Sequence, residues 1–188
     1  MHKALLASIV IALAPISARA ANVDITFNPS TAILSPGDIT FVDMIGTYDG
    51  TDKVVGGAIS LDFRADLLEV LSVILKVPTD IDGSAGHVSA TGNAGRVDTI
   101  GFSSFTGVSG TFEIATIEFR ALGPLGTSPL TAFDSNDLIF AWANEAFEPV
   151  TVSSTAGSIA VVPEPASWGM MLGGLALTSL IMAWHKRA

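Results

Sequence analysis

Residues 54–63 read VVGGAISLDF, and this stretch decides the class of fold. Its larger apolar residues recur at every second position, and the face they define is made of Val55, Gly57, Ile59, Leu61 and Phe63. A period of two is that of a β-strand with one buried face. The pair Gly56 and Gly57 predicts a bulge or a close approach by another part of the chain. We therefore expect a strand that lies across a hydrophobic core.

On both sides of this stretch, short β-branched and aromatic runs alternate with clusters of Gly, Pro, Asn and Asp, which is the pattern of strands and turns. The expected strands are residues 23–27, 32–34, 39–45, 67–75, 87–91, 96–105, 112–121, 128–133, 137–142 and 156–162, with 149–153 as an edge. Residues 78–86 are expected to form a loop, and 92–95 (GNAG) a hairpin connection. Residues 21–162 show no helical periodicity over three turns, so we predict an all-β, antiparallel two-sheet sandwich.

Several short motifs of this region resemble the cohesin domain. They are PGD at 36–38, VGGAISLDF at 55–63, LLEVLSV at 67–73, GTFEIATIEF at 110–119, Gly126, and GSIAV at 157–161. The resemblance covers nearly all of residues 21–162 and implies a jelly-roll sandwich of about nine strands. Cohesins are related to carbohydrate-binding modules and bind calcium-loaded dockerins through a sheet face. This chain carries one copy of the domain, and none of its residues matches a dockerin-contacting position.

Both ends of the sequence have the composition of targeting segments. Residues 1–20 contain His2 and Lys3, an apolar run at 4–16, and the A-x-A pattern Ala18-Arg19-Ala20 before Ala21. This is the layout of a secretory signal peptide cleaved before Ala21. Residues 21–162 then form one domain of 142 residues, which is long enough to bury a core.

The last segment, residues 163–188, has three parts. Pro163, Glu164 and Pro165 are followed by an uncharged span at 166–184, and then by His185, Lys186 and Arg187. As a helix the span would be ~28 Å long, close to the thickness of a bilayer core. We predict a single transmembrane helix at 166–184, with the basic cluster at 185–187 on the cytoplasmic side.

The ordered tail at 163–188 resembles the PEP-CTERM sorting signal of Gram-negative bacteria. The resemblance implies that an exosortase recognises Pro163, Glu164 and Pro165, cleaves the tail, and sorts the protein to the cell surface or the exopolysaccharide matrix. The two prolines hold the backbone extended and remove two amide donors, which suits presentation to a protease.

The charge of the predicted domain excludes one class of partner. Residues 21–162 contain five basic and 17 acidic residues, a net charge of −12. Because phosphate is repelled by this charge, we expect no nucleic-acid partner. The chain has no cysteine, which excludes disulfides and thiol catalysis and leaves the fold to rest on its core.

Catalytic and metal-binding patterns are sparse. His87 is the one histidine of residues 21–162, so a catalytic triad would depend on it, and we expect a surface imidazole instead. Calcium would bind at one of two oxygen-rich turns, the first with Asp80, Asp82 and Gly83 and the second with Asp134, Asn136 and Asp137. Ordinary turn chemistry explains both turns. We predict no catalytic residue, no metal site and no cofactor.

We therefore expect an exported, non-catalytic protein that serves recognition or adhesion. One alternative is a carbohydrate-binding module for matrix polysaccharide, in which Tyr48, Trp142 and Phe147 would form an aromatic platform, although core packing is the more usual role of such residues. Another alternative is a small secreted hydrolase that uses paired carboxylates. The partners expected are an exosortase, the membrane through the tail, and an exopolysaccharide or a dockerin-like surface protein.

Overall fold

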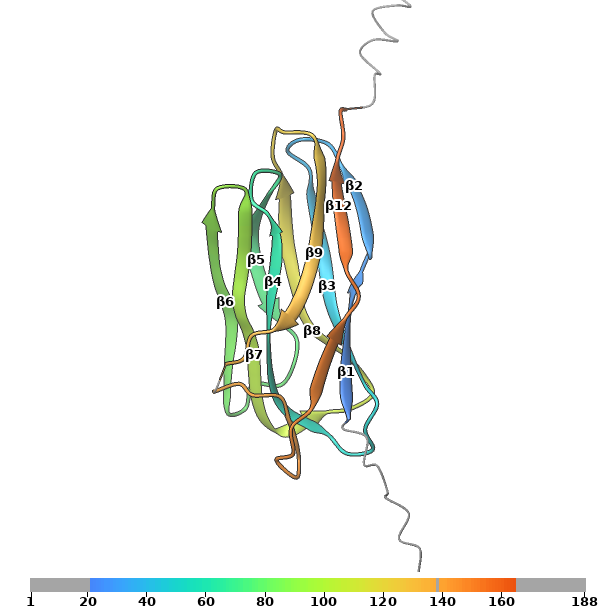
Figure 1. Ribbon diagram of the computed structural model, residues 1–188, viewed down its shortest axis with the longest axis vertical. Coiled ribbons are helices and arrows are strands. Elements are labelled where there is room, and N and C mark those ends of the chain that lie inside the picture. Colours follow the sequence, from blue (N-terminus) through green and yellow to red (C-terminus); the bar gives the residue numbers. More distant parts are fainter. Residues whose placement is uncertain (1–20, 138, 165–188) are drawn as a thin grey trace, which may run out of the picture.

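The computed structural model describes residues 21–137 and 139–164, which form an elongated β-sandwich (Figure 1). Its strands are β1 (Asn22–Asn28), β2 (Thr31–Leu34), β3 (Ile39–Tyr48), β4 (Val54–Arg64), β5 (Leu68–Leu75), β6 (Asp82–Thr91), β7 (Ala94–Val108), β8 (Thr111–Ala121), β9 (Gly126–Asp134), β10 (Ala143–Asn144), β11 (Thr151–Ser154) and β12 (Gly157–Val161). The described residues contain no helix of the length and apolarity needed to span a membrane. The predicted signal peptide, residues 1–20, and transmembrane helix, residues 166–184, lie outside the described residues.

The strands form two sheets that pack face to face, as predicted. One has the order β11-β1-β3-β8-β5; the other has the order β2-β12-β9-β4-β7-β6, with β10 beside β4. The predicted antiparallel two-sheet sandwich is confirmed, with 12 strands where about nine were expected. The chain passes from one sheet to the other at residues 29–30 and again at 155–156. Two pairs at these edges are parallel, β1 with β11 and β2 with β12.

The core lies between the sheets, and β4 supplies its centre. Ile59 and Leu61 are fully buried, and the ring of Phe63 meets that of Phe119 edge to face at 5.8 Å. The register of β4 against β7 shifts between Val54 and Gly56, which confirms the predicted bulge. As a result Val54 lies in the core, whereas Val55, which the alternation had placed there, is half-buried.

The close approach expected at the glycine pair is made by Trp142. Its indole packs on Gly57, its Nε1 donates a hydrogen bond to the Ala58 carbonyl at 2.9 Å, and its ring lies edge to face with Phe102. The predicted strand at 137–142 is therefore wrong: β9 ends at Asp134, and pairing along β4 resumes with β10. This connection carries a core side chain instead of a strand.

The hairpin expected at 92–95 is confirmed, since Thr91 and Ala94 are paired across a two-residue turn. The loop expected at 78–86 is only half correct, because β6 begins at Asp82. Nearly all of β6 is exposed, so its sequence lacks the apolar alternation that identifies a strand.

Tyr48 closes the core at the end of β3. It is 4% exposed, and its hydroxyl donates to Asp52 Oδ1 at 2.6 Å. Burial, helped by the hydrogen bond and charge of Asp52, raises the pKa of Tyr48 to about 12.

We predict that Gly57→Ala lowers the free energy of unfolding by about 1–3 kcal/mol, because overpacking a filled core is destabilising. An added Cβ at this position would lie 2.4–2.5 Å from three ring atoms of Trp142. The matched control is Gly123→Ala, where no heavy atom lies within 4 Å of the added Cβ. Urea denaturation of both variants tests this, and equal midpoints would contradict the packing of Trp142 on Gly57.

A second prediction concerns alkaline pH. Tyr48 is the only tyrosine of the chain, so tyrosinate absorbance near ~295 nm reports on this residue alone. The folded protein should titrate near pH 12, and the unfolded protein near pH ~10. Because the folded state retains the proton longer, the contribution of Tyr48 to stability should be constant below pH ~10 and should fall as the pH rises from there toward 12. Tyr48→Phe should reduce that fall, and a folded-state midpoint near 10 would exclude the buried hydroxyl.

Candidate functional site

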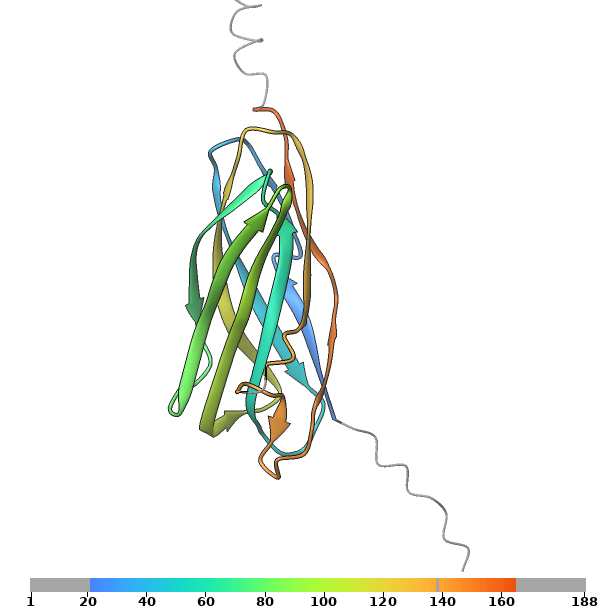
Figure 2. The ribbon, with the colours of Figure 1, turned by 60° about the vertical axis from the view of Figure 1, so that its left-hand side comes forward.

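The outer surface of β9, β4, β7 and β6 carries a row of polar side chains. The register places Thr131 of β9 beside Asp62 of β4, Asp62 beside Arg96 of β7, and Arg96 beside Ser89 of β6. Thr131, Asp62 and Arg96 alternate with buried residues of their strands, so they point away from the core, and the register places Ser89 on the same face. Figure 2 shows β4, β7 and β6 side by side along one side of the sandwich. We call this four-strand surface the polar face.

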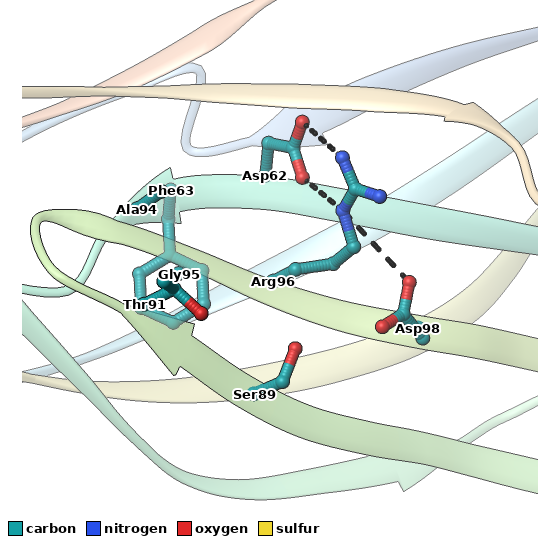
Figure 3. A pocket seen from close by; sticks show the side chains of 8 residues that line it. All are labelled: Asp62, Phe63, Ser89, Thr91, Ala94, Gly95, Arg96 and Asp98. Atoms are coloured by element: carbon teal, nitrogen blue, oxygen red, sulfur yellow. Dashed lines mark hydrogen bonds and ion pairs between the residues drawn. The ribbon is translucent and has the colours of Figure 1, made fainter.

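Arg96 is held in a fixed position at the centre of the polar face (Figure 3). Its Nε and Nη2 donate to the two carboxylate oxygens of Asp62 at 2.6 and 3.0 Å, and Nε lies 3.8 Å from Asp98 Oδ1. Its guanidinium carbon also lies 4.8 Å from the centroid of the Phe133 ring, a cation–π contact. The hydrogen bonds from Arg96 to Asp62 raise the pKa of Arg96, so the guanidinium stays charged.

A shallow hollow of about 340 Å³ opens beside this pair. Its lining consists of Asp62, Phe63, Ser89, Thr91, Ala94, Gly95, Arg96 and Asp98 (Figure 3). The hydroxyls of Ser89 and Thr91 have no hydrogen-bond partner among the described residues. The hollow thus offers a fixed cation, two carboxylates and two free hydroxyls, which suits a polar ligand or polar side chains of another protein.

The backbone beneath the hollow is strained. Thr99 has a φ of +58°, which is rare for a β-branched residue, and the register of β4 against β7 shifts at this point. The amide of Thr99 and the carboxylate of Asp98 both contact the buried Ser60 hydroxyl at 3.4 Å. On β6 the neighbouring Gly86 has a φ of +84°, and a Cβ there would lie 2.7 Å from the Val97 side chain. Asp98 lies two residues after Arg96 on β7, so the two side chains share one face of the strand.

His87 is an exposed residue of β6 and a cross-strand partner of Asp98. Ser89 lies two residues further on, on the same face of the strand. No hydrogen bond joins His87 to either side chain in the part of the chain that the structure describes. Catalysis through a hydrogen-bonded triad has no geometric basis at this position.

The two oxygen-rich turns use their carboxylates for backbone hydrogen bonds. A hydrogen bond from the Ser104 hydroxyl is the largest influence that lowers the pKa of Asp80. The amides of Phe105 and Thr106, which donate to Asp80 Oδ2, lower it further. Asp134 Oδ1 accepts from the Asn136 amide, and Asp137 Oδ1 from that of Ile139. Across residues 21–137 and 139–164, no three His, Asp or Glu side chains come close enough together to hold a metal ion.

The aromatic platform considered for sugar binding is wrong. Trp142 is 5% exposed and Tyr48 is 4% exposed, so both belong to the core, whereas Phe147 is 84% exposed. The three rings therefore share no surface. Their spacing in the sequence gives no signal that separates a ring inserted between sheets from a ring on the outside.

The predicted sorting and cleavage positions lie at the margins of the described chain. Pro163 and Glu164 are exposed beyond β12, while Pro165, His185, Lys186 and Arg187 lie outside the described residues. Ala18 and Ala20 also lie outside them. The carbonyl of Ala21 accepts a hydrogen bond from the Thr151 amide at 3.0 Å, so backbone pairing begins at the first described residue.

No protein-family model matches the sequence, and no curated protein matches it. Solved structures of cohesins are similar in fold. The seventh type I cohesin of ScaB from Pseudobacteroides cellulosolvens is 14% identical, with a TM-score of 0.54 over 78% of this chain and 94% of that one. The cohesin of a type I cohesin–dockerin complex from Clostridium thermocellum is 14% identical, with a TM-score of 0.54 over 77% of this chain and 100% of that one.

A non-cellulosomal cohesin from the hyperthermophilic archaeon Archaeoglobus fulgidus is 17% identical, with a TM-score of 0.51 over 81% of this chain and 98% of that one. At these identities the likeness concerns the fold. The two sheets of residues 21–162 form a cohesin-like jelly-roll sandwich.

Proposed function

We propose that this protein is an exported, non-catalytic recognition module that binds another protein through the polar face. The observation that carries the proposal is the Arg96 guanidinium, which two carboxylates and an aromatic ring hold on an open sheet surface. Arginine is enriched among the residues that dominate protein interfaces. Because this side chain is already ordered, binding it would cost little further conformational entropy.

The fold supports the same proposal. One structurally similar cohesin was solved in complex with a dockerin, and another is described as non-cellulosomal. We propose a dockerin-like protein as the kind of partner, with polar side chains that complement Asp62, Arg96 and Asp98. The likeness in fold does not transfer individual contacts, so the partner must be identified by binding.

The proposed route to the cell surface depends on the tail. Glu164 lies three residues beyond the last strand, which ends at Val161, and is exposed, so a protease can reach this part of the chain without unfolding the sandwich. We propose that an exosortase recognises Pro163, Glu164 and Pro165 while residues 166–184 span the inner membrane, and that the released domain reaches the surface or the matrix.

A second candidate function is the binding of matrix polysaccharide. The free hydroxyls of Ser89 and Thr91, next to two carboxylates, are groups that hydrogen-bond to sugar hydroxyls, and this observation favours it. The lining of the hollow includes one aromatic residue, Phe63, which is 6% exposed and offers little stacking surface for a sugar ring. Protein recognition is therefore the first choice.

We predict that Arg96→Glu weakens binding to a protein partner about 30-fold, an effect of about 2 kcal/mol that is typical of an interface hot spot. The matched control is Arg120→Glu, because Arg120 forms a similar pair with Glu69 on the other sheet. The side chains of Arg120 and Glu69 are 45% and 44% exposed, and those of Arg96 and Asp62 are 45% and 43% exposed. Biosensor titrations against a panel of dockerin modules and against purified matrix polysaccharide provide the measurement. Equal losses in both variants, or binding to polysaccharide alone, would refute the proposal.

The sorting proposal has its own test. Replacement of Pro163, Glu164 and Pro165 by alanine should leave the tail attached and keep the protein in the inner membrane. Intact-mass measurement of the protein in surface and membrane fractions shows whether the tail is still attached. The control is Pro149→Ala, which changes an exposed proline outside the tail. A full-length wild-type protein in the surface fraction would contradict processing.

A further inference from the structure

A second surface lies at the end of the sandwich where β4 begins and β7 ends. It is a hollow of about 280 Å³, and we call it the end pocket. Its lining consists of Val55, Ile81, Ser103, Ser104, Phe105, Glu145 and Phe147. The turn after β10 that carries Phe147 belongs to the orange segment at the lower end of Figure 1, away from the point where β12 leaves the sandwich. The end pocket shares no residue with the hollow of the polar face.

The end pocket is flanked by exposed aromatic rings. Phe105 is 82% and Phe147 is 84% exposed, the highest values of any large hydrophobic side chain among the described residues. Ile81, on the same lining, is 49% exposed. Single exposed hydrophobic residues are common, but a group of them around a hollow marks an interaction site.

Both rings are held on rigid backbone. Phe147 has a φ of +59°, and its amide donates to the Asn144 carbonyl at 2.9 Å. The buried Asn144 side chain accepts from the amides of Ala146 and Glu148, at 3.1 and 2.8 Å, and so fixes this turn. Sparsely populated backbone conformations in exposed loops are characteristic of binding sites.

On the other side of the end pocket, Asp80 accepts from the Phe105 amide at 3.0 Å, and the buried Ser104 hydroxyl accepts from the Gly107 amide at 3.0 Å. The Phe105 ring is therefore presented on a segment with several internal hydrogen bonds. Because both rings are already placed, a ligand that inserts between them would lose little affinity to ordering of the loops.

The charges around the end pocket indicate the chemistry of the occupant. Glu145 lines the pocket, the carboxylate of Asp80 lies against Phe105, and Glu148 belongs to the same turn as Phe147. The cation nearby, Lys53, donates to the Thr106 carbonyl at 3.0 Å. The rim is thus predominantly negative. An apolar cavity with an acidic rim complements a large apolar side chain that has cationic neighbours.

We infer that the end pocket binds a protein segment in which a large apolar side chain is flanked by lysine or arginine. The apolar side chain inserts between Phe105 and Phe147, and its basic neighbours lie against Glu145 and Asp80. This site goes beyond the proposed function of the polar face and is independent of it. It would give the module a second contact, with a partner of different chemistry.

The test uses the full chain in lipid nanodiscs and the fluorescein-labelled peptide GKFKG as the probe, with fluorescence anisotropy as the readout. We expect saturable binding that tightens at low ionic strength and is weakened about tenfold by Phe105→Ala and by Phe147→Ala. The matched control is Phe41→Ala, which removes a ring that is 56% exposed on β3 of the other sheet and should leave binding unchanged. Arg96→Glu should also leave it unchanged, which separates this site from the polar face.

Peptides GKAKG and GEFEG test the two halves of the chemistry, and each should bind at least about tenfold more weakly than GKFKG. Glu145→Lys should reduce the preference for GKFKG over GEFEG. Equal affinity for GEFEG, an equal loss in the Phe41 variant, or binding of cello-oligosaccharides in place of the peptide would each overturn the inference. Absence of saturable binding by GKFKG at millimolar concentration would do the same.

Discussion

Strand β4 is the element on which the rest of the structure depends, because it is paired on both sides and is covered on its inner face. It is hydrogen-bonded to β7 along one edge, and to β9 and then β10 along the other. Its inner side chains, Ile59, Leu61 and Phe63, fill the space between the sheets. A one-residue slip would move this set to the outer face, so burial fixes the register of β4 strictly. The same register places Asp62 beside Arg96 and so builds the polar face.

The constraint on β4 extends to the end pocket. Trp142 packs on Gly57 and donates to the Ala58 carbonyl, and this contact holds the connection between β9 and β10 against the sheet. Immediately after it, Asn144 pairs with Val54 and fixes the turn that carries Phe147. The exposed ring is therefore positioned by a buried one five residues earlier. Two surfaces with different chemistry depend in this way on one central strand.

The elements that could be predicted from the sequence are those in which local pattern and final environment agree. The strand at 54–63, the hairpin at 92–95 and the strand at 112–121 satisfy that condition, and the structure has all three. β6 could not be predicted in full, because an edge strand with few buried residues has no apolar period. Core packing was the more usual role expected for Trp142, but its contact with Gly57 could not be predicted, because the two residues lie far apart in the sequence. The polar face gave no signal in the sequence, because its residues Arg96, Asp62 and Phe133 are at least 34 positions apart from one another. Only the register of the sheet brings them together.

The distribution of charge explains why the two surfaces differ in the partners they favour. Each arginine in the described part of the chain is paired with a carboxylate: Arg64 with Asp66, Arg96 with Asp62, and Arg120 with Glu69. Exposed pairs of this kind add little to stability, so their main effect here is to neutralise and fix the cations. The other acids of residues 21–162 outnumber the two lysines, and the domain therefore has a strongly negative net charge. A cationic partner would be attracted from a distance and would bind where the negative charge coincides with exposed apolar surface.

The two surfaces differ in the interaction on which recognition depends. At the polar face the cation is already balanced by Asp62 and Asp98, so recognition there depends on the direction of hydrogen bonds. At the end pocket it depends on burial of the Phe105 and Phe147 rings.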